Sequence, residues 1–149
     1  MNIKNMKKMF ETLDAPLVNP RWSWGAVRPQ DGVVFLRVWQ DRMRMHDGCQ
    51  FVQVHAPRRA LNTRVKPGRR ERLEHVDLSR HGASCYLIMC EARDQSERPR
   101  RVKDFNDAEV FRGGRLVELD GEWYIERLDG LSVEEAKSPI SRSKVIGAS

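Results

Sequence analysis

The sequence predicts a β-rich α+β fold, with a strongly curved sheet or small open β-barrel and one or two helices. Short segments rich in β-branched and aromatic residues follow one another closely, and tight-turn signals separate them. A chain of 149 residues suffices for one compact domain and is too short for two. We therefore expect one β-rich domain over 19–130, an N-terminal helix or arm over 1–18, and a turn and disordered tail over 131–149.

The first residues predict a short amphipathic helix, because four apolar residues follow helical spacing and a proline ends the pattern. These residues are Ile3, Met6, Phe10, Leu13 and Pro16. Whether this helix packs against the domain, against a partner subunit or only loosely stays open at this point.

Residues 19–40 predict two strands joined by a loop at 28–32, where Pro and Asp-Gly supply turn residues. Trp22 and Trp24 are two residues apart, so on a strand they face the same side. The second strand, 33–40, is apolar on both faces and is expected in the interior of the sheet. Its one charged residue, Arg37, shares a face with Phe35 and Trp39.

The rest of the chain predicts further strands and one central helix. Strands are expected over 49–55 and 85–92, and a hairpin over 115–128 turns at Asp120-Gly121, a type I′ signal. A polar connection over 41–48 ends in a second Asp-Gly turn signal. The helix is expected from about Arg70 to His81, with Leu73 and Val76 on its buried stripe and Gly82 after its end. Basic connections occupy 56–72 and 93–103, and Ser132 begins a capped helical turn.

The charge balance favours anionic partners. The 27 Lys and Arg residues exceed the 21 Asp and Glu residues, giving a formal charge of +6 and a pI of about 9.6, which is typical of nucleic-acid-binding proteins. No signal-peptide pattern and no apolar run of membrane-spanning length is present. Three cysteines without a secreted framework indicate reduced thiols and a cytoplasmic protein with no membrane association.

Motifs for catalysis or metal binding are weak. His81, Cys85 and Cys90 lack metal-site spacing, and the two cysteines, five apart, should point to opposite faces of one strand. Hydrolase and nucleotide-binding motifs are missing from the sequence. We expect no catalytic residue, no metal and no cofactor, and we favour a non-enzymatic role.

The candidate site combines aromatic and basic residues. Trp22 or Trp24 is expected to stack on a flipped or single-stranded base, with the polar edge supplied by Ser23, Arg37 or Gln40. Trp39, on a neighbouring strand, could line the same pocket, but Trp39 and Trp123 are both expected in the core. The guanidinium groups of the basic segment 58–72 suit phosphate contacts. The alternative is that this segment is an ordinary charged loop that faces solvent. The candidate nucleic-acid-binding residues are Trp22, Trp24, Arg21, Arg37, Arg58, Arg59, Arg69 and Arg70.

With its tryptophan-rich opening segment Asn19-Pro20-Arg21-Trp22-Ser23-Trp24-Gly25, a small curved sheet with inserted helices and basic connections, the chain resembles PUA-like modules of the EVE, ASCH and SRA types. The resemblance covers about residues 19–128 and transfers no individual pocket residue. It implies binding of RNA, or of DNA bearing a modified base, without chemistry.

Two functions of different class follow. The first is a non-catalytic nucleic-acid reader, with DNA or RNA as partner and a modified or flipped base as its target. The alternative is a small protein-interaction module, such as a phage- or plasmid-type regulator or inhibitor of a cellular machine. Steep salt dependence is expected of the first and a weaker one of the second, because phosphate binding releases counter-ions.

Overall fold

The computed structural model of the chain describes residues 5–56, 66–97 and 100–140. Within this part of the chain it confirms the predicted fold class, since eight strands form one open, curved sheet that is accompanied by three helices. The strands are β1 (Gly25–Val27), β2 (Val34–Trp39), β3 (Met43–His46), β4 (Cys49–His55), β5 (Cys85–Ala92), β6 (Val102–Phe105), β7 (Glu109–Leu119) and β8 (Glu122–Ser132). The helices are α1 (Met6–Thr12), α2 (Pro67–Arg80) and α3 (Val133–Ala136), with a 3-10 turn η1 (Gln40–Arg42) after β2.

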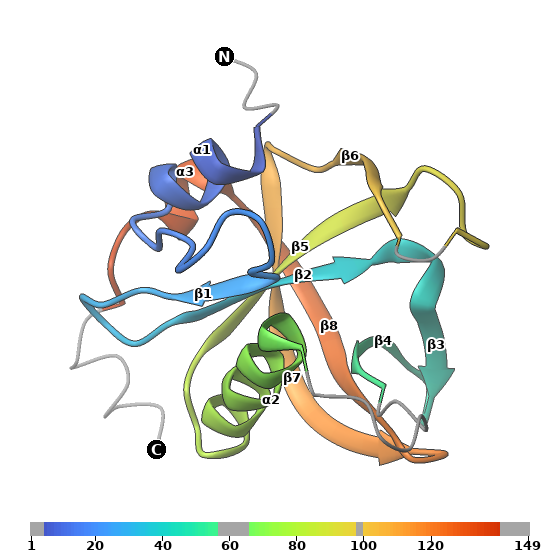
Figure 1. The fold of residues 1–149 in the computed structure, drawn as a ribbon. Helices are drawn as coiled ribbons and strands as arrows, with labels where there is room; N and C mark the ends of the chain where they lie inside the picture. The colour runs from blue at the N-terminus through green and yellow to red at the C-terminus, as the bar shows by residue number, and fades with distance from the viewer. Residues whose placement is uncertain (1–4, 57–65, 98–99, 141–149) are drawn as a thin grey trace.

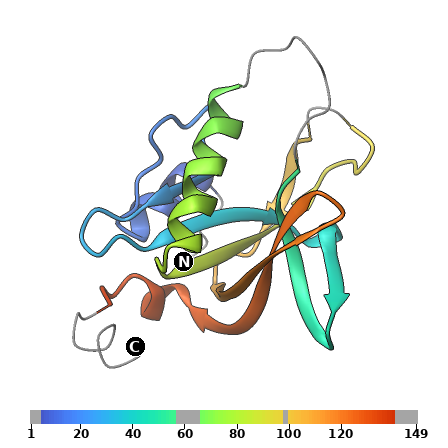
Figure 2. The ribbon, with the colours of Figure 1, turned by 90° about the horizontal axis from the view of Figure 1, so that it is seen from below.

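The sheet curls so that its two halves face each other (Figures 1 and 2). Its strand order is β1-β2-β5-β7-β8-β4-β3, with β6 added beside β5. The β2–β5 pair is parallel, and the other pairs are antiparallel. Strands β2 and β4 are not hydrogen-bonded neighbours, yet they contact each other across the concave side. Helix α2 contacts β1, β2 and β4 and so covers one end of this concave side.

The two faces of the sheet bury separate apolar cores. On the concave side, alternate residues of β2, β4 and β5 pack with Val76 of α2 and Ile125 of β8. On the convex side, the intervening residues of β2 and β5 pack under α1 and α3, with Phe35 and Ile88 fully buried. This division follows from strand geometry, because successive side chains point to opposite faces. A strand that is apolar on both faces, as β2 was predicted to be, is therefore covered on both sides.

Several predicted elements are confirmed. The β7–β8 hairpin turns at Asp120-Gly121 with positive φ at both residues, 53° and 78°, as a type I′ turn requires. Strands β4 and β5 have the predicted bounds, and Gly82 follows α2 with φ of 100°. Ser132 caps α3 through a reciprocal pair of hydrogen bonds with Glu135.

Other predictions were wrong in detail. Trp22 lies in a turn, and β1 begins only at Gly25. Residues 41–48, predicted as a connection, contain η1 and β3, which pairs with β4 through the turn at Asp47-Gly48. The second basic connection likewise contains β6. Both missed strands are short, and four residues carry too little alternation to reveal a strand.

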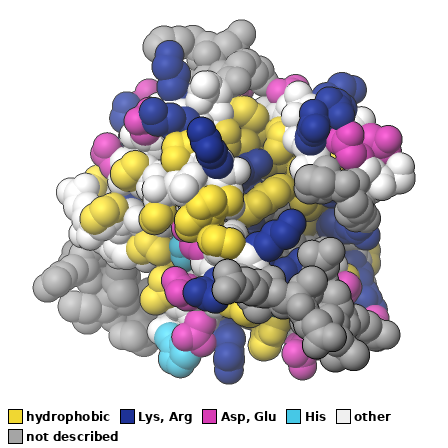
Figure 3. Space-filling model, viewed as in Figure 1, with side chains coloured by type: hydrophobic (Ala, Val, Ile, Leu, Met, Phe, Trp, Pro, Cys, Tyr) yellow, Lys and Arg dark blue, Asp and Glu magenta, His cyan; other side chains and the backbone are white. Residues whose placement is uncertain are grey.

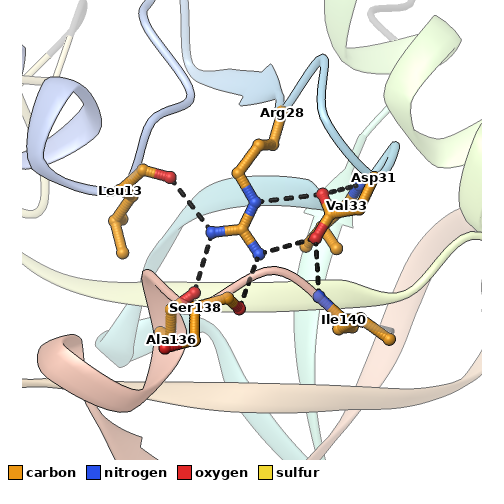
Figure 4. Close-up of polar contacts among 7 residues, drawn as sticks. All are labelled: Leu13, Arg28, Asp31, Val33, Ala136, Ser138 and Ile140. Carbon is orange, nitrogen blue, oxygen red and sulfur yellow. Dashed lines mark hydrogen bonds and ion pairs between the residues drawn. The ribbon is translucent and has the colours of Figure 1, made fainter. Parts of the chain in front are cut away.

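The ends of the described chain are held together by a buried arginine (Figure 4). The Arg28 side chain is fully buried and donates to the carbonyl oxygens of Leu13 and Ala136, at 3.1 and 2.8 Å. Its Nε and Nη2 atoms also bind the two carboxylate oxygens of Asp31, at 3.0 and 2.9 Å. The Ile140 amide donates to the same carboxylate at 3.0 Å. Residues 138–140, predicted as part of a disordered tail, are thus attached to the domain, while 141–149 lie outside the described residues.

Candidate nucleic-acid interface

The segment before β1 is a turn that is closed by its own asparagine. Asn19 Oδ1 accepts from the Arg21 amide at 2.9 Å, and the Asn19 carbonyl accepts from the amides of Trp22 and Ser23. Asparagine favours such turns because its side chain bonds to the backbone two residues on. The turn holds Trp22 half-buried beside the sheet and leaves Arg21 exposed. Trp22 and Trp24 therefore do not form the predicted pair on one strand.

Trp24 packs against two side chains of the neighbouring strand β2. The Arg37 amide donates to the Trp24 carbonyl at 2.9 Å, so these two residues face each other at the start of the β1–β2 pair. The Arg37 guanidinium lies 4.3 Å from the centre of the Trp24 ring, at cation–π distance. Trp39 shares the face of Arg37, and its ring meets Trp24 edge to face with centroids 5.4 Å apart. Both indoles are half-buried.

A second arginine completes this cluster from the other side. The Arg100 guanidinium lies 5.4 Å from the centre of the Trp39 ring, and both of its terminal nitrogens bind Asp41 at 2.8 Å. We call Trp24, Arg37, Trp39 and Arg100 the Trp–Arg platform. Figure 3 shows hydrophobic side chains gathered near the middle of the face on which β1, β2 and β5 meet, with Lys and Arg side chains beside them.

Helix α2 supports the platform with a buried polar stripe. Arg72 donates to the backbone carbonyls of Val54, Trp24 and Arg37, at 3.0, 3.0 and 2.6 Å, and thereby joins the helix to β4, to β2 and to the residue before β1. Glu71 accepts a hydrogen bond from the Ser23 hydroxyl at 3.0 Å. Ser23 is fully buried by this contact, so its hydroxyl does not supply the polar edge that was predicted for it.

Burial shifts the titration of these groups. It lowers the pKa of Arg37, and burial together with the neighbouring Arg37 charge lowers the pKa of Arg72 to about 10. Both guanidiniums stay charged near neutral pH. Burial, and then the Arg72 charge, lowers the pKa of His75 to about 4, so this imidazole is neutral there. Burial raises the pKa of the Glu71 carboxyl.

The positive charge of the platform is not fully balanced. In residues 5–56, 66–97 and 100–140, the Arg100 guanidinium pairs with a carboxylate, whereas neither Arg37 nor Arg72 forms such a pair. Instead, backbone carbonyl oxygens accept from these two arginines. Carbonyl groups supply no counter-charge, and the buried Nε atoms of both arginines have no hydrogen-bond partner among the described residues. The arrangement favours an anion beside Arg37, the more accessible of the two.

Two further predicted site residues, Arg69 and Arg70, lie in the first turn of α2. Gly68 packs so closely on the opening segment that a Cβ there would lie 2.7 Å from the Trp22 carbonyl oxygen. The next two residues are Arg69, which donates to the Ala56 carbonyl, and Arg70, which is exposed. Their charges lie near the platform. Arg58 and Arg59 lie outside the described residues.

Three contributors were not identified from the sequence, namely Asp41, Arg72 and Arg100. Trp39 was considered for the pocket but was expected in the core. Buried positions of α2 follow helical spacing, at Gly68, Glu71, Arg72, His75 and Val76. Most of these side chains are polar, so an apolar pattern does not reveal them, and the predicted buried residue Leu73 is 43% exposed. A signal for Trp39 did exist, because it shares a strand face with Arg37.

The described residues contain no cluster of three or more metal-ligating side chains. Cys85 packs in the concave core and Cys90 in the convex core, which confirms that they point to opposite faces. None of the described helices has both the length and the apolar character needed to cross a bilayer. Comparisons with protein-family models, curated proteins and solved structures found no match for this chain.

Proposed function

We propose that this chain binds nucleic acid without catalysing a reaction on it, and that the Trp–Arg platform is its contact surface. The observation that carries the proposal is the Arg37 guanidinium, which lies 4.3 Å from the centre of the Trp24 ring and pairs with no described carboxylate. A phosphate oxygen provides the missing negative charge, and a guanidinium matches its geometry.

The two indoles support the aromatic part of the proposal. Trp24 and Trp39 retain exposed ring surface at half-buried positions, and their interplanar angle of 61° presents two differently oriented surfaces. Base stacking on an aromatic side chain contributes roughly 1–3 kcal/mol per base and tolerates every base. Single-stranded nucleic acid is the form whose bases are free to stack in this way.

The surroundings add long-range attraction. Arg69, Arg70 and Lys66 occupy the start of α2, whose N-terminal end carries partial positive charge. The net charge of +6 acts in the same direction on the approach of a polyanion. We place this function in the reducing cytoplasm, where the three free cysteines stay reduced. Membership of the PUA-like group stays a prediction.

A matched pair of tryptophan variants tests the platform. Trp39 and Trp123 are both half-buried, and each has an arginine guanidinium 5.4 Å from its ring centre. Of these two tryptophans, only Trp39 belongs to the platform. Anisotropy titrations of a labelled single-stranded oligonucleotide should show that Trp39→Ala weakens binding by about 5- to 150-fold, equivalent to roughly 1–3 kcal/mol. Trp123→Ala should leave the affinity unchanged.

The salt dependence tests the charge. Arg37→Gln should weaken binding to every sequence and reduce the log–log salt slope by about 0.7 for each phosphate of a single strand that the variant no longer neutralises. Circular dichroism confirms that each variant is folded before titration. Folded Trp39→Ala and Arg37→Gln proteins that bind like the wild type would refute the proposal.

A protein-interaction role is the second candidate. It rests on the outward side of α2, where Leu73 and Leu78 are 43% and 42% exposed. Exposed apolar side chains on a helix often mark a protein contact. In that case binding to the partner should change little with salt and should be abolished by Leu73→Glu, while Trp39→Ala should leave it intact.

A further inference from the structure

The concave side of the sheet holds a cavity at the end that α2 does not cover. Its volume is about 460 Å³, and its lining residues come from η1, from the turn after β6 and from the strands β3, β4, β5, β6, β7 and β8. Both polar and apolar side chains line the cavity, among them Gln40, Gln50, Met89, Glu91, Phe111 and Arg127. Ligand sites are typically concavities of this size with a few convergent polar groups on an apolar wall.

One wall carries hydrogen-bond donors beside an aromatic ring. The Arg127 guanidinium lies 4.5 Å from the centre of the Phe111 ring, and its Nη2 donates to Gln50 Oε1 at 2.7 Å. Its Nε is buried and has no hydrogen-bond partner among the described residues. A buried donor without a partner is unfavourable, and an acceptor on a ligand relieves that cost.

The opposite wall offers acceptors. Glu91 is an acceptor-only group when ionised, and the ammonium of Lys103 approaches it at 3.4 Å. The side-chain amides of Gln40 and Asn106, which also line the cavity, both donate and accept. Met89, on the same strand as Glu91, adds apolar surface to the lining. A ligand that matches this cavity is a flat heterocycle that accepts hydrogen bonds along one edge and donates hydrogen bonds along another.

We propose that this cavity binds a single nucleobase, and that it prefers bases with an exocyclic amino group over uracil or thymine. An amino group donates to the Glu91 carboxylate, while the acceptors of the same base face Arg127. Purine and pyrimidine rings are flat enough to lie against Phe111 and Met89. The volume of about 460 Å³ admits a base together with its sugar.

The cavity adjoins the platform, so this inference rests on the proposed function and gives it a base preference. Trp39 of the platform and Gln40 of the cavity are consecutive at the end of β2. Trp39 packs against the convex core, whereas Met89 and Phe111 of the cavity belong to the concave core. In the proposed complex, a strand that stacks on Trp39 therefore continues around the end of β2, and one of its bases turns into the cavity. Free nucleosides carry the same chemistry and separate the cavity from the platform experimentally.

Calorimetric titrations with guanosine, adenosine, cytidine and uridine test the cavity alone, and anisotropy titrations with oligonucleotides of single composition test it in a strand. Gln50→Trp places an indole in the cavity, and Gln30→Trp, in the exposed β1–β2 loop, is its control. We expect Gln50→Trp to weaken binding of the amino-bearing nucleosides at least about tenfold. It should also remove the preference for amino-bearing bases in strands, while Gln30→Trp changes neither.

Glu91→Gln tests whether the Glu91 carboxylate recognises the amino group of the base, because the amide that replaces it can also donate a hydrogen bond to a carbonyl oxygen. It should improve uridine binding relative to cytidine and leave the protein folded. Nucleoside binding without strand binding would support the cavity and refute the platform. Strand binding whose base preference is the same in Gln50→Trp as in the wild type would refute the cavity alone. Absence of both nucleoside binding and base preference would also refute it.

Discussion

Replacing Arg28 with methionine should lower the free energy of unfolding by about 3–5 kcal/mol, the usual cost of removing one partner from a buried ion pair. The side chain is fully buried, and that of Asp31 is 7% exposed. In the variant, Asp31 loses its counter-charge, and the carbonyl groups of Leu13 and Ala136 lose a donor. The individual losses are not additive, because all of them pass through one guanidinium.

Urea unfolding followed by circular dichroism measures this change. For a chain of this length, 1 kcal/mol corresponds to about 2–4 °C, so the melting temperature should fall by about 6–20 °C. The control is Arg112→Met, the same substitution at an exposed arginine 3.4 Å from exposed Asp129. Exposed pairs contribute about 0–1 kcal/mol, so the control should melt close to the wild type.

The charge on Asp31 provides the refuting measurement. Although burial opposes ionisation, the hydrogen bonds from Arg28 and from the amides of Ile140 and Val33 hold the pKa of Asp31 below its ordinary value. Adding Asp31→Asn to Arg28→Met should therefore recover part of the lost stability, because it removes the unpaired charge. A single variant that is destabilised no more than Arg112→Met, or a double variant that loses the sum of two large effects, would refute the reasoning.

Three further predictions concern single positions. Gly121→Val should cost about 1–2 kcal/mol, because the turn holds φ at 78° and a β-branched residue resists it; an unchanged melting temperature would contradict the type I′ turn. Gly68→Ala should cost about 1–3 kcal/mol, because the new Cβ would lie 2.7 Å from the Trp22 oxygen; a variant that melts at or above the wild-type temperature would contradict that packing. The pKa of His75 is about 4 in the folded protein, below the roughly 6.5 of a histidine in the unfolded chain. The free energy of unfolding should therefore be unaffected by His75 above pH 6.5 and should fall by up to roughly 3 kcal/mol as the pH is lowered toward 4. His75→Phe should flatten this decline in urea titrations, and an equally steep decline in that variant would assign it to other groups.

Local chemistry accounts for what the sequence determined by itself. Asp120-Gly121 specifies its turn because only a few residue types accept positive φ, and Ser132 caps its helix through atoms three residues away. Alternation predicted the bounds of β4, a continuous apolar run predicted those of β5, and the composition of the short segments indicated the β-rich class. Each of these signals acts within about a dozen residues of chain, so no long-range contact is needed to interpret them.

Tertiary structure alone decided the roles of the arginines. Arg28 reads as a loop residue, yet it is fully buried and binds Ala136, 108 residues away. Arg72 falls in a basic run typical of solvent-exposed loops, yet its guanidinium donates to backbone carbonyls of β4, of β2 and of Trp24 before β1. An arginine is buried only where folding brings enough acceptors around it.

The arrangement of the candidate site was partly predictable for the same reason. Arg37 and Trp39 share a strand face by their spacing, and the Trp-rich opening contains Trp24, which packs against both. Their meeting with Trp24 depends on the β1–β2 register, and the approach of Arg100 depends on its bidentate pairing with Asp41, 59 residues away. Spacing along a chain determines which side chains share a face, whereas strand register and long-range pairing determine which faces meet.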